Sequence, residues 1–85
     1  MSKQFKVVAV STNTNSFGLR GMVLMAKDGE AWQVGANDIN IKKKGDIVTL
    51  EMDSVDVIFA NLGFEIPVKL LNAPESVINE VWGPT

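Results

Sequence analysis

The chain has 85 residues, of which 46% are hydrophobic and 21% are charged, and its formal net charge is −2. A chain of this length forms one domain. Because it contains no Cys and no His, disulfide bonds, Cys or His zinc sites, and catalysis through a thiolate or an imidazole are excluded. The mildly acidic charge balance also argues against a constitutive coat on nucleic acid, which needs a basic excess.

The motifs that carry enzyme chemistry are missing from the sequence. It has no Gly-x-Ser-x-Gly elbow, no phosphate-binding loop and no dinucleotide fingerprint. The acidic residues Glu51, Asp53 and Asp56 lack the spacing of a calcium-binding loop, so we expect neither a metal ion nor a cofactor. No apolar stretch is long enough for a signal peptide or a membrane span, which favours a cytoplasmic protein without membrane contact.

The first predicted element is a strand over residues 5–10. Nearly every position in this segment is apolar, which is typical of a strand partly covered on both faces. Six short polar side chains follow at residues 11–16. They compete for backbone hydrogen bonds and therefore predict a loop.

The clearest local signal is the dipeptide Asp28-Gly29 between two apolar segments, 22–27 and 30–34. It predicts a β-hairpin closed by a two-residue type I′ turn. Counting outward from such a turn places Lys27 opposite Glu30.

The same register assigns the faces of the predicted hairpin. Met22 and Leu24 would lie on one face, because side chains alternate along a strand. The core side would then be formed by alternate residues of the two strands, namely Val23, Met25, Trp32 and Val34.

A long connection over residues 35–45 leads to a predicted strand at 47–52, with Val48, Leu50 and Met52 pointing inward. The next segment, 54–62, fits either a short helix or a strand. We favour one or two helical turns, because its apolar residues recur at helical spacing.

The last part of the chain predicts an edge strand and a helix. Apolar residues alternate over 64–70, and Pro67 within this run indicates an edge strand because proline donates no backbone hydrogen bond. A short helix is predicted over 74–82, with Trp82 on its apolar stripe. A helix this short is unstable alone, so we expect it to dock on the sheet through Trp82, with Val77, Ile78 and Val81 completing the contact.

Together these elements predict a mainly β fold. We expect a single domain over residues 1–85, built as a small closed or half-closed five-stranded barrel of OB-like or SH3-like type with a docked C-terminal helix.

The favoured function is a non-catalytic protein-binding module, such as an assembly or inhibitor subunit, that acts through an apolar face and an edge strand. In the predicted register Met22 and Leu24 form an apolar patch away from the core, and such patches mark partner sites. The partner would be another protein, or a second copy of the chain in a two-fold dimer. The predicted binding residues are Met22, Leu24, Gln33, Pro67 and Trp82.

The alternative is a single-stranded nucleic-acid-binding OB-like domain. Phe17 and Arg20 share a glycine-flanked loop, where a ring can stack on a base and a cation can pair with a phosphate. Lys42, Lys43 and Lys44 would extend this basic face if they lie near that loop. Otherwise Phe17 folds back onto the core, and the lysines form a solvated face that keeps an edge soluble.

Overall fold

The computed structural model describes residues 2–70 and 72–83, without the side chain of Ile66. It confirms a mainly β fold with a short C-terminal helix. In chain order, the elements are β1 Ser2–Thr14, β2 Arg20–Ala26, β3 Ala31–Ala36, β4 Ile47–Glu51, α1 Val55–Asn61, β5 Phe64–Lys69 and α2 Glu75–Trp82.

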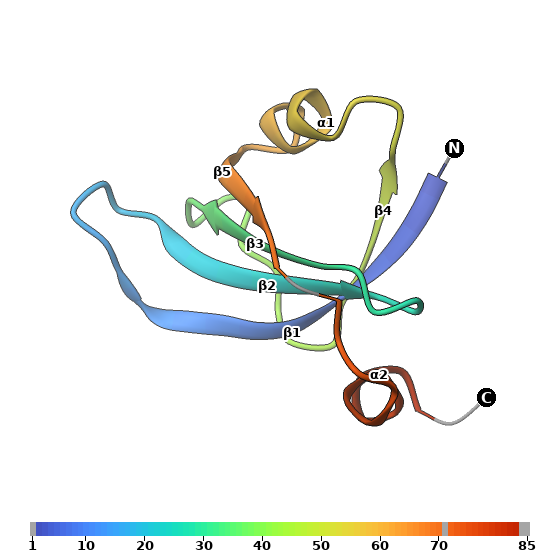
Figure 1. Ribbon diagram of the computed structural model, residues 1–85. Coiled ribbons are helices and arrows are strands. Elements are labelled where there is room, and N and C mark those ends of the chain that lie inside the picture. Colours follow the sequence, from blue (N-terminus) through green and yellow to red (C-terminus); the bar gives the residue numbers. More distant parts are fainter. Residues whose placement is uncertain (1, 71, 84–85) are drawn as a thin grey trace.

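The five strands form one sheet in the order β4-β1-β2-β3-β5, and every neighbouring pair is antiparallel. The sheet curls into an open half-barrel, with β4 and β5 at its two edges and α1 lying between them (Figure 1). The described strands do not close into a barrel, so of the two predicted forms the structure has the half-closed one. The expectation that Pro67 lies in an edge strand is confirmed, because β5 is the last strand in the order.

The core lies on the concave face of the sheet, beneath α1. Phe59 of α1 is fully buried, and its ring centroid lies 5.2 Å from that of Trp32 and 6.0 Å from that of Phe64. The helix therefore covers the open side of the half-barrel. The largest fully buried side chains are those of Phe5, Val7, Met22, Leu24, Val34, Leu50 and Phe59.

The segment after β4 is helical, as favoured. Val55 and Ile58 pack against the core on the same side as Phe59, which is the pattern that the helical spacing predicted. The helix ends before Gly63, whose φ of 79° is the left-handed conformation common after a helix. In the preceding strand Leu50 is buried, and Val48 and Met52 pack against the core.

The hairpin between β2 and β3 exists, but its predicted register is wrong by one residue. Its loop has three residues, since the Ala26 N–H donates to the Glu30 carbonyl (2.8 Å) and the Gly29 N–H to the Ala26 carbonyl (3.0 Å). Gly29 has a φ of 92°. This is a turn followed by a left-handed glycine, the common three-residue hairpin loop.

The shifted register exchanges the faces of β2. Leu24 pairs with Trp32, and Met22 pairs with Val34. Since side chains alternate along a strand, a shift of one residue turns every side chain to the other face. Met22 and Leu24 therefore point into the core, with exposed fractions of 1% and 0%.

Strand β1 is longer than predicted and includes residues 11–14, which were expected to form a loop. Its pairing with β2 continues to Thr14 opposite Arg20, with register shifts along the way. The loop proper spans residues 15–19. The side-chain oxygen of Asn15 organises it by accepting hydrogen bonds from the N–H groups of Phe17 (2.9 Å) and Leu19 (3.0 Å).

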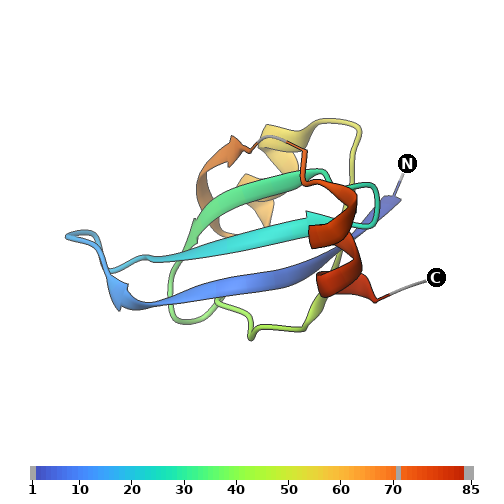
Figure 2. The ribbon, with the colours of Figure 1, turned by 60° about the horizontal axis from the view of Figure 1, so that its bottom comes forward.

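Helix α2 docks on the convex face of the sheet (Figure 2), which confirms the predicted role of Trp82. The indole Nε1 donates to the Met25 carbonyl at 3.0 Å. The ammonium groups of Lys6 and Lys27 lie 5.4 Å and 5.3 Å from the centroid of the indole ring. Met25 beneath the helix is 6% exposed, so α2 takes part of the convex face away from solvent.

Candidate binding groove

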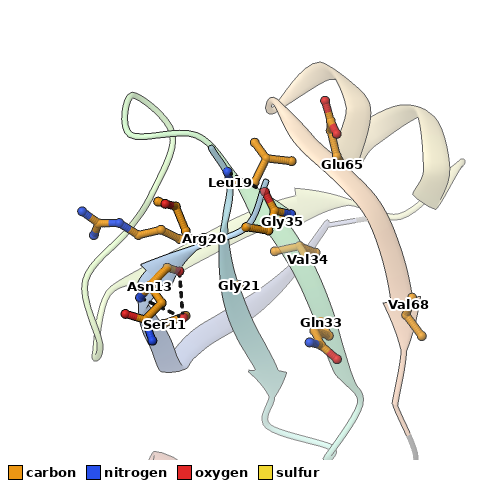
Figure 3. Close-up of a pocket in the computed structure, with 12 residues that line it drawn as sticks. Ser11, Asn13, Leu19, Arg20, Gly21, Gln33, Val34, Gly35, Glu65 and Val68 are labelled. Atoms are coloured by element: carbon orange, nitrogen blue, oxygen red, sulfur yellow. Dashed lines mark hydrogen bonds between the residues drawn. The ribbon is translucent and has the colours of Figure 1, made fainter. Parts of the chain in front are cut away.

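A groove of about 560 Å³ lies on the convex face of β2 and β3. It is at the end of this face that α2 leaves uncovered. One wall comes from the end of β1 and the loop after it, and the other comes from β5. Figure 3 shows Ser11 and Asn13 on one side of Gly21 and Gly35, with Glu65 and Val68 on the other.

The floor of the groove is bare backbone. Gly21 of β2 and Gly35 of β3 are directly paired, so two neighbouring strands carry no side chain at the same point. Gln33 follows on the same face of β3 and is exposed.

The wall from β1 is polar and locally ordered. The Ser11 hydroxyl donates to the Asn13 carbonyl at 3.0 Å and accepts from the Asn13 N–H at 3.2 Å. These bonds lie in the last residues of β1, at the point where the β1–β2 register shifts. Asn15 continues this wall into the loop.

The groove carries little net charge. The guanidinium of Arg20 points away from the floor (Figure 3), and its Nη2 lies 3.6 Å from the Asp38 carboxylate. Glu65 on the opposite wall is exposed. Most of the remaining lining is amide, hydroxyl or apolar, with Leu19 and Val68 supplying apolar surface.

Of the residues predicted to bind protein, Gln33 lies in the groove. Met22 and Leu24 are in the core, so the apolar patch predicted from them is not on the surface, and the register error explains why. Trp82 holds α2 against the sheet at 3.0 Å from the Met25 carbonyl.

The position of Pro67 makes the edge of β5 a poor template for an added strand. Glu65 pairs with Gly35 and Val68 with Gln33, so the register shifts across the segment that contains Pro67. A bulge and a residue without an N–H both interrupt the row of hydrogen-bonding groups that an incoming strand needs.

The predicted basic and aromatic face is not brought together. Phe17 is 83% exposed at the tip of the β1–β2 loop. The lysine run, Lys42 to Lys44, belongs to a connection that returns to Val7, whose carbonyl accepts from the Gly45 N–H at 2.8 Å. Thr14, at the end of β1 near the loop, lies about 20 Å further along the strand than Val7.

A cluster of charged side chains lies at the end of the sheet away from the groove. The Lys3 ammonium lies 2.7 Å from Asp28 and 2.5 Å from Glu30, and Lys69 lies 3.2 Å from Glu30. The predicted pairing of Lys27 with Glu30 is therefore wrong, since Lys27 lies over the Trp82 ring instead.

The hydrogen bonds of this cluster shift its pKa values. Burial alone would lower the pKa of Lys3, but the hydrogen bonds and charges of Asp28 and Glu30 outweigh it, so the pKa of Lys3 is raised. Burial alone would raise the pKa of Glu30, but the hydrogen bonds and charges of Lys3 and Lys69 outweigh it, so the pKa of Glu30 is lowered. The pKa of Asp28 is lowered by its hydrogen bond with Lys3 and by the Glu30 N–H. These shifts belong to an ion cluster away from the groove, and we assign the cluster a structural role.

The residues that sequence reasoning missed are the paired glycines and the Asn13 to Asn15 wall. In the predicted register Gly21 faces Ala36, so no bare floor would have been seen. The signal was present in the sequence, since two glycines flank the hairpin at nearly equal distances from its turn.

Within residues 2–70 and 72–83, no group of three or more Asp or Glu side chains is placed to hold a metal ion. In the same part of the chain, no helix has the length and apolar character needed to cross a membrane. Comparison with known proteins gives no match to a family model, a curated protein or a solved structure.

Proposed function

We propose that the protein is a non-catalytic protein-binding module and that the groove on the convex face of β2 and β3 receives a segment of the partner. The observation that carries the proposal is the groove itself, which has a bare floor at Gly21 and Gly35 between two walls of different chemistry. Ligand sites combine apolar surface with a few polar groups that fix orientation. Val68 and Leu19 supply the apolar surface, and the side chains of Asn13 and Gln33 supply polar groups.

The place of the groove in the fold supports this reading. With β1 paired to β4 and β3 paired to β5, the described strands form an open half-barrel, and we compare it with the partly open barrel of an OB fold. OB folds bind oligonucleotides and oligosaccharides on the face of strands 2 and 3, with the loops that join strands 1 to 2 and strands 4 to 5. The comparison therefore supports the position of the site, and the chemistry of its lining decides the class of ligand. The groove lies on those strands here, beside the loop at 15–19 and the start of β5.

The chemistry of the groove favours a peptide over a nucleic acid. Amide and hydroxyl side chains can both donate to and accept from the peptide groups of another chain. A single-stranded nucleic acid instead needs several cations along its backbone and aromatic rings for its bases. The described lining contains one cation, Arg20, which is already near Asp38, and no aromatic ring.

A selection experiment tests the proposal. A displayed library of random peptides is panned against the wild-type protein, and the enriched peptides are synthesised and titrated by fluorescence anisotropy. We expect binding that is lost in Gln33→Lys, which places a long charged side chain in the groove. Enriched peptides that bind Gln33→Lys as well as the wild type would contradict the proposal, and so would a library that yields no binder.

The same assay tests nucleic-acid binding through Phe17, Arg20 and Lys42 to Lys44. A labelled oligothymidylate at low salt should show no binding, because these groups are not assembled into one face. Binding that weakens steeply with salt and is lost in Lys43→Ala would favour the nucleic-acid function over the proposed one.

A further inference from the structure

We infer that the groove takes a short, extended peptide segment without acidic side chains, whose main chain lies directly over the Gly21–Gly35 pair. This inference rests on the proposed function and names the kind of segment that the site accepts.

The fold itself does not require glycine at either position. A Cβ added to Gly21 would have its nearest neighbour, the Ser11 Cβ, at 3.9 Å. A Cβ on Gly35 would lie 3.6 Å from the Glu65 carbonyl oxygen and 3.7 Å from the Leu19 Cδ1, which are ordinary contact distances. Neither residue is among the glycines with positive φ, so no backbone strain would follow from a side chain.

Gly29 provides the contrast within the same chain. A Cβ there would meet the Ala73 carbonyl oxygen at 2.8 Å, and its φ is 92°, so both space and backbone demand glycine. At Gly21 and Gly35 neither demand exists, although glycine inside a strand weakens the sheet. Strands carry glycine at bulges, at bends and where another backbone approaches closely. Gly21 and Gly35 both lie beside a register shift of the sheet, but the space above each is open to a Cβ, and this open space is what favours close approach of a ligand backbone.

The length of the groove limits the segment. A smaller hollow, lined by Ala9, Val10 and Val23 among others, shares Ser11, Gly21 and Gln33 with the groove and continues it toward α2. Met25 is the next residue after Val23 on this face of β2, and its carbonyl accepts a hydrogen bond from the Trp82 indole, so α2 bounds the path on this side. Gly21 and Met25 are four residues apart in β2, a distance of about 13 Å, which matches about four residues of extended chain.

Charge restricts the segment further. Glu65 is an exposed carboxylate on one wall, and the Arg20 guanidinium turns away from the floor toward Asp38. An acidic side chain in the groove would meet Glu65, and the described lining residues offer it no cation besides Arg20, which is directed at Asp38. Uncharged side chains fit the amide and hydroxyl rim.

The test adds side-chain atoms to the floor. Gly21→Ala, Gly35→Ala and Gly35→Val are titrated with the peptides enriched in the selection, and each variant is also melted. We expect melting temperatures equal to or above that of the wild type and dissociation constants raised by about tenfold or more. Thr49→Val, an exposed strand position in β4 outside the groove, should change neither quantity.

The outcomes separate this inference from the proposed function. Variants that melt well below the wild type would show that the glycines serve the bend of the sheet, which overturns the inference. Peptides that bind all three variants as tightly as the wild type would also overturn it, while loss of binding in Gln33→Lys would still uphold the proposed function. Enrichment of acidic peptides that compete for the same groove would contradict the charge restriction.

Discussion

Trp82 is the residue on which the position of α2 depends. Every residue of the helix keeps part of its surface exposed, so burial alone holds the helix weakly. The indole adds a hydrogen bond to the Met25 carbonyl and lies beneath two ammonium groups. Lys6 contributes a second link, since its Nζ donates to the Val81 carbonyl at 3.1 Å.

Two substitutions separate these contributions. Trp82→Phe keeps a ring but loses the hydrogen bond, and should lower the free energy of unfolding by about 1 kcal/mol. Trp82→Ala also loses both cation–π contacts and should cost about 2–3 kcal/mol. Urea denaturation followed by circular dichroism measures both values. An Ala variant as stable as the wild type would mean that α2 is not held by this residue.

Glu30 links folding stability to pH. Its burial would raise its pKa, but hydrogen bonds from Lys3 and Lys69 outweigh burial and lower it below the ordinary 4.5. As pH falls, the unfolded chain therefore binds the proton first, so the stabilisation is complete at neutral pH and is lost through and below about pH 4.5. Lys3 has the opposite sign: its raised pKa means that its contribution is lost only above 10.5.

Glu30→Gln tests this linkage. The variant should melt below the wild type at neutral pH, and the difference between their melting temperatures should shrink as pH falls from about 5 to about 3. Glu65→Gln, on the neighbouring strand outside the ion cluster, should leave the acid limb unchanged. A difference for Glu30→Gln that stays constant over this range would contradict the assigned role of the cluster.

At the scale of elements, the hairpin shows how one residue decides which surface a strand presents. The dipeptide Asp28-Gly29 correctly located the turn, but its glycine suits a two-residue loop as well as a three-residue loop with a left-handed glycine, and the loop observed is also bonded to the distant segment that precedes α2. The Ala73 N–H donates to the Gly29 carbonyl at 2.9 Å. That contact involves residues far apart in sequence, which local patterns do not report.

Gly29→Ala should therefore destabilise both the hairpin and the docking of α2. A left-handed alanine costs about 1–2 kcal/mol, and the new Cβ would also press on the Ala73 oxygen and the Ile78 Cδ1 at 2.8 and 2.9 Å. We expect a total loss of about 2 kcal/mol or more in urea denaturation. Gly35→Ala serves as the matched control without strain, and equal effects of the two changes would contradict this account of the glycines.

For the molecule as a whole, local patterns predicted more of the fold than of the site. The short helix at 55–61, the edge strand with Pro67 and the docked Trp82 each follow from the spacing or chemistry of a few adjacent residues. The groove does not, because β1, the hairpin and β5 each contribute a part of it. Its floor appears only when the register pairs Gly21 with Gly35, and that register was wrong by one residue.

We propose that the convex face of β2 and β3 binds a protein segment. Amide chemical shifts, recorded while the labelled protein is titrated with an enriched peptide, test it most directly. We expect the largest changes at Gly21, Gln33, Gly35 and Val68, with small changes along β4 and α2. Shifts concentrated on the connection at 41–46 or on α2, with the glycine pair unaffected, would contradict the account.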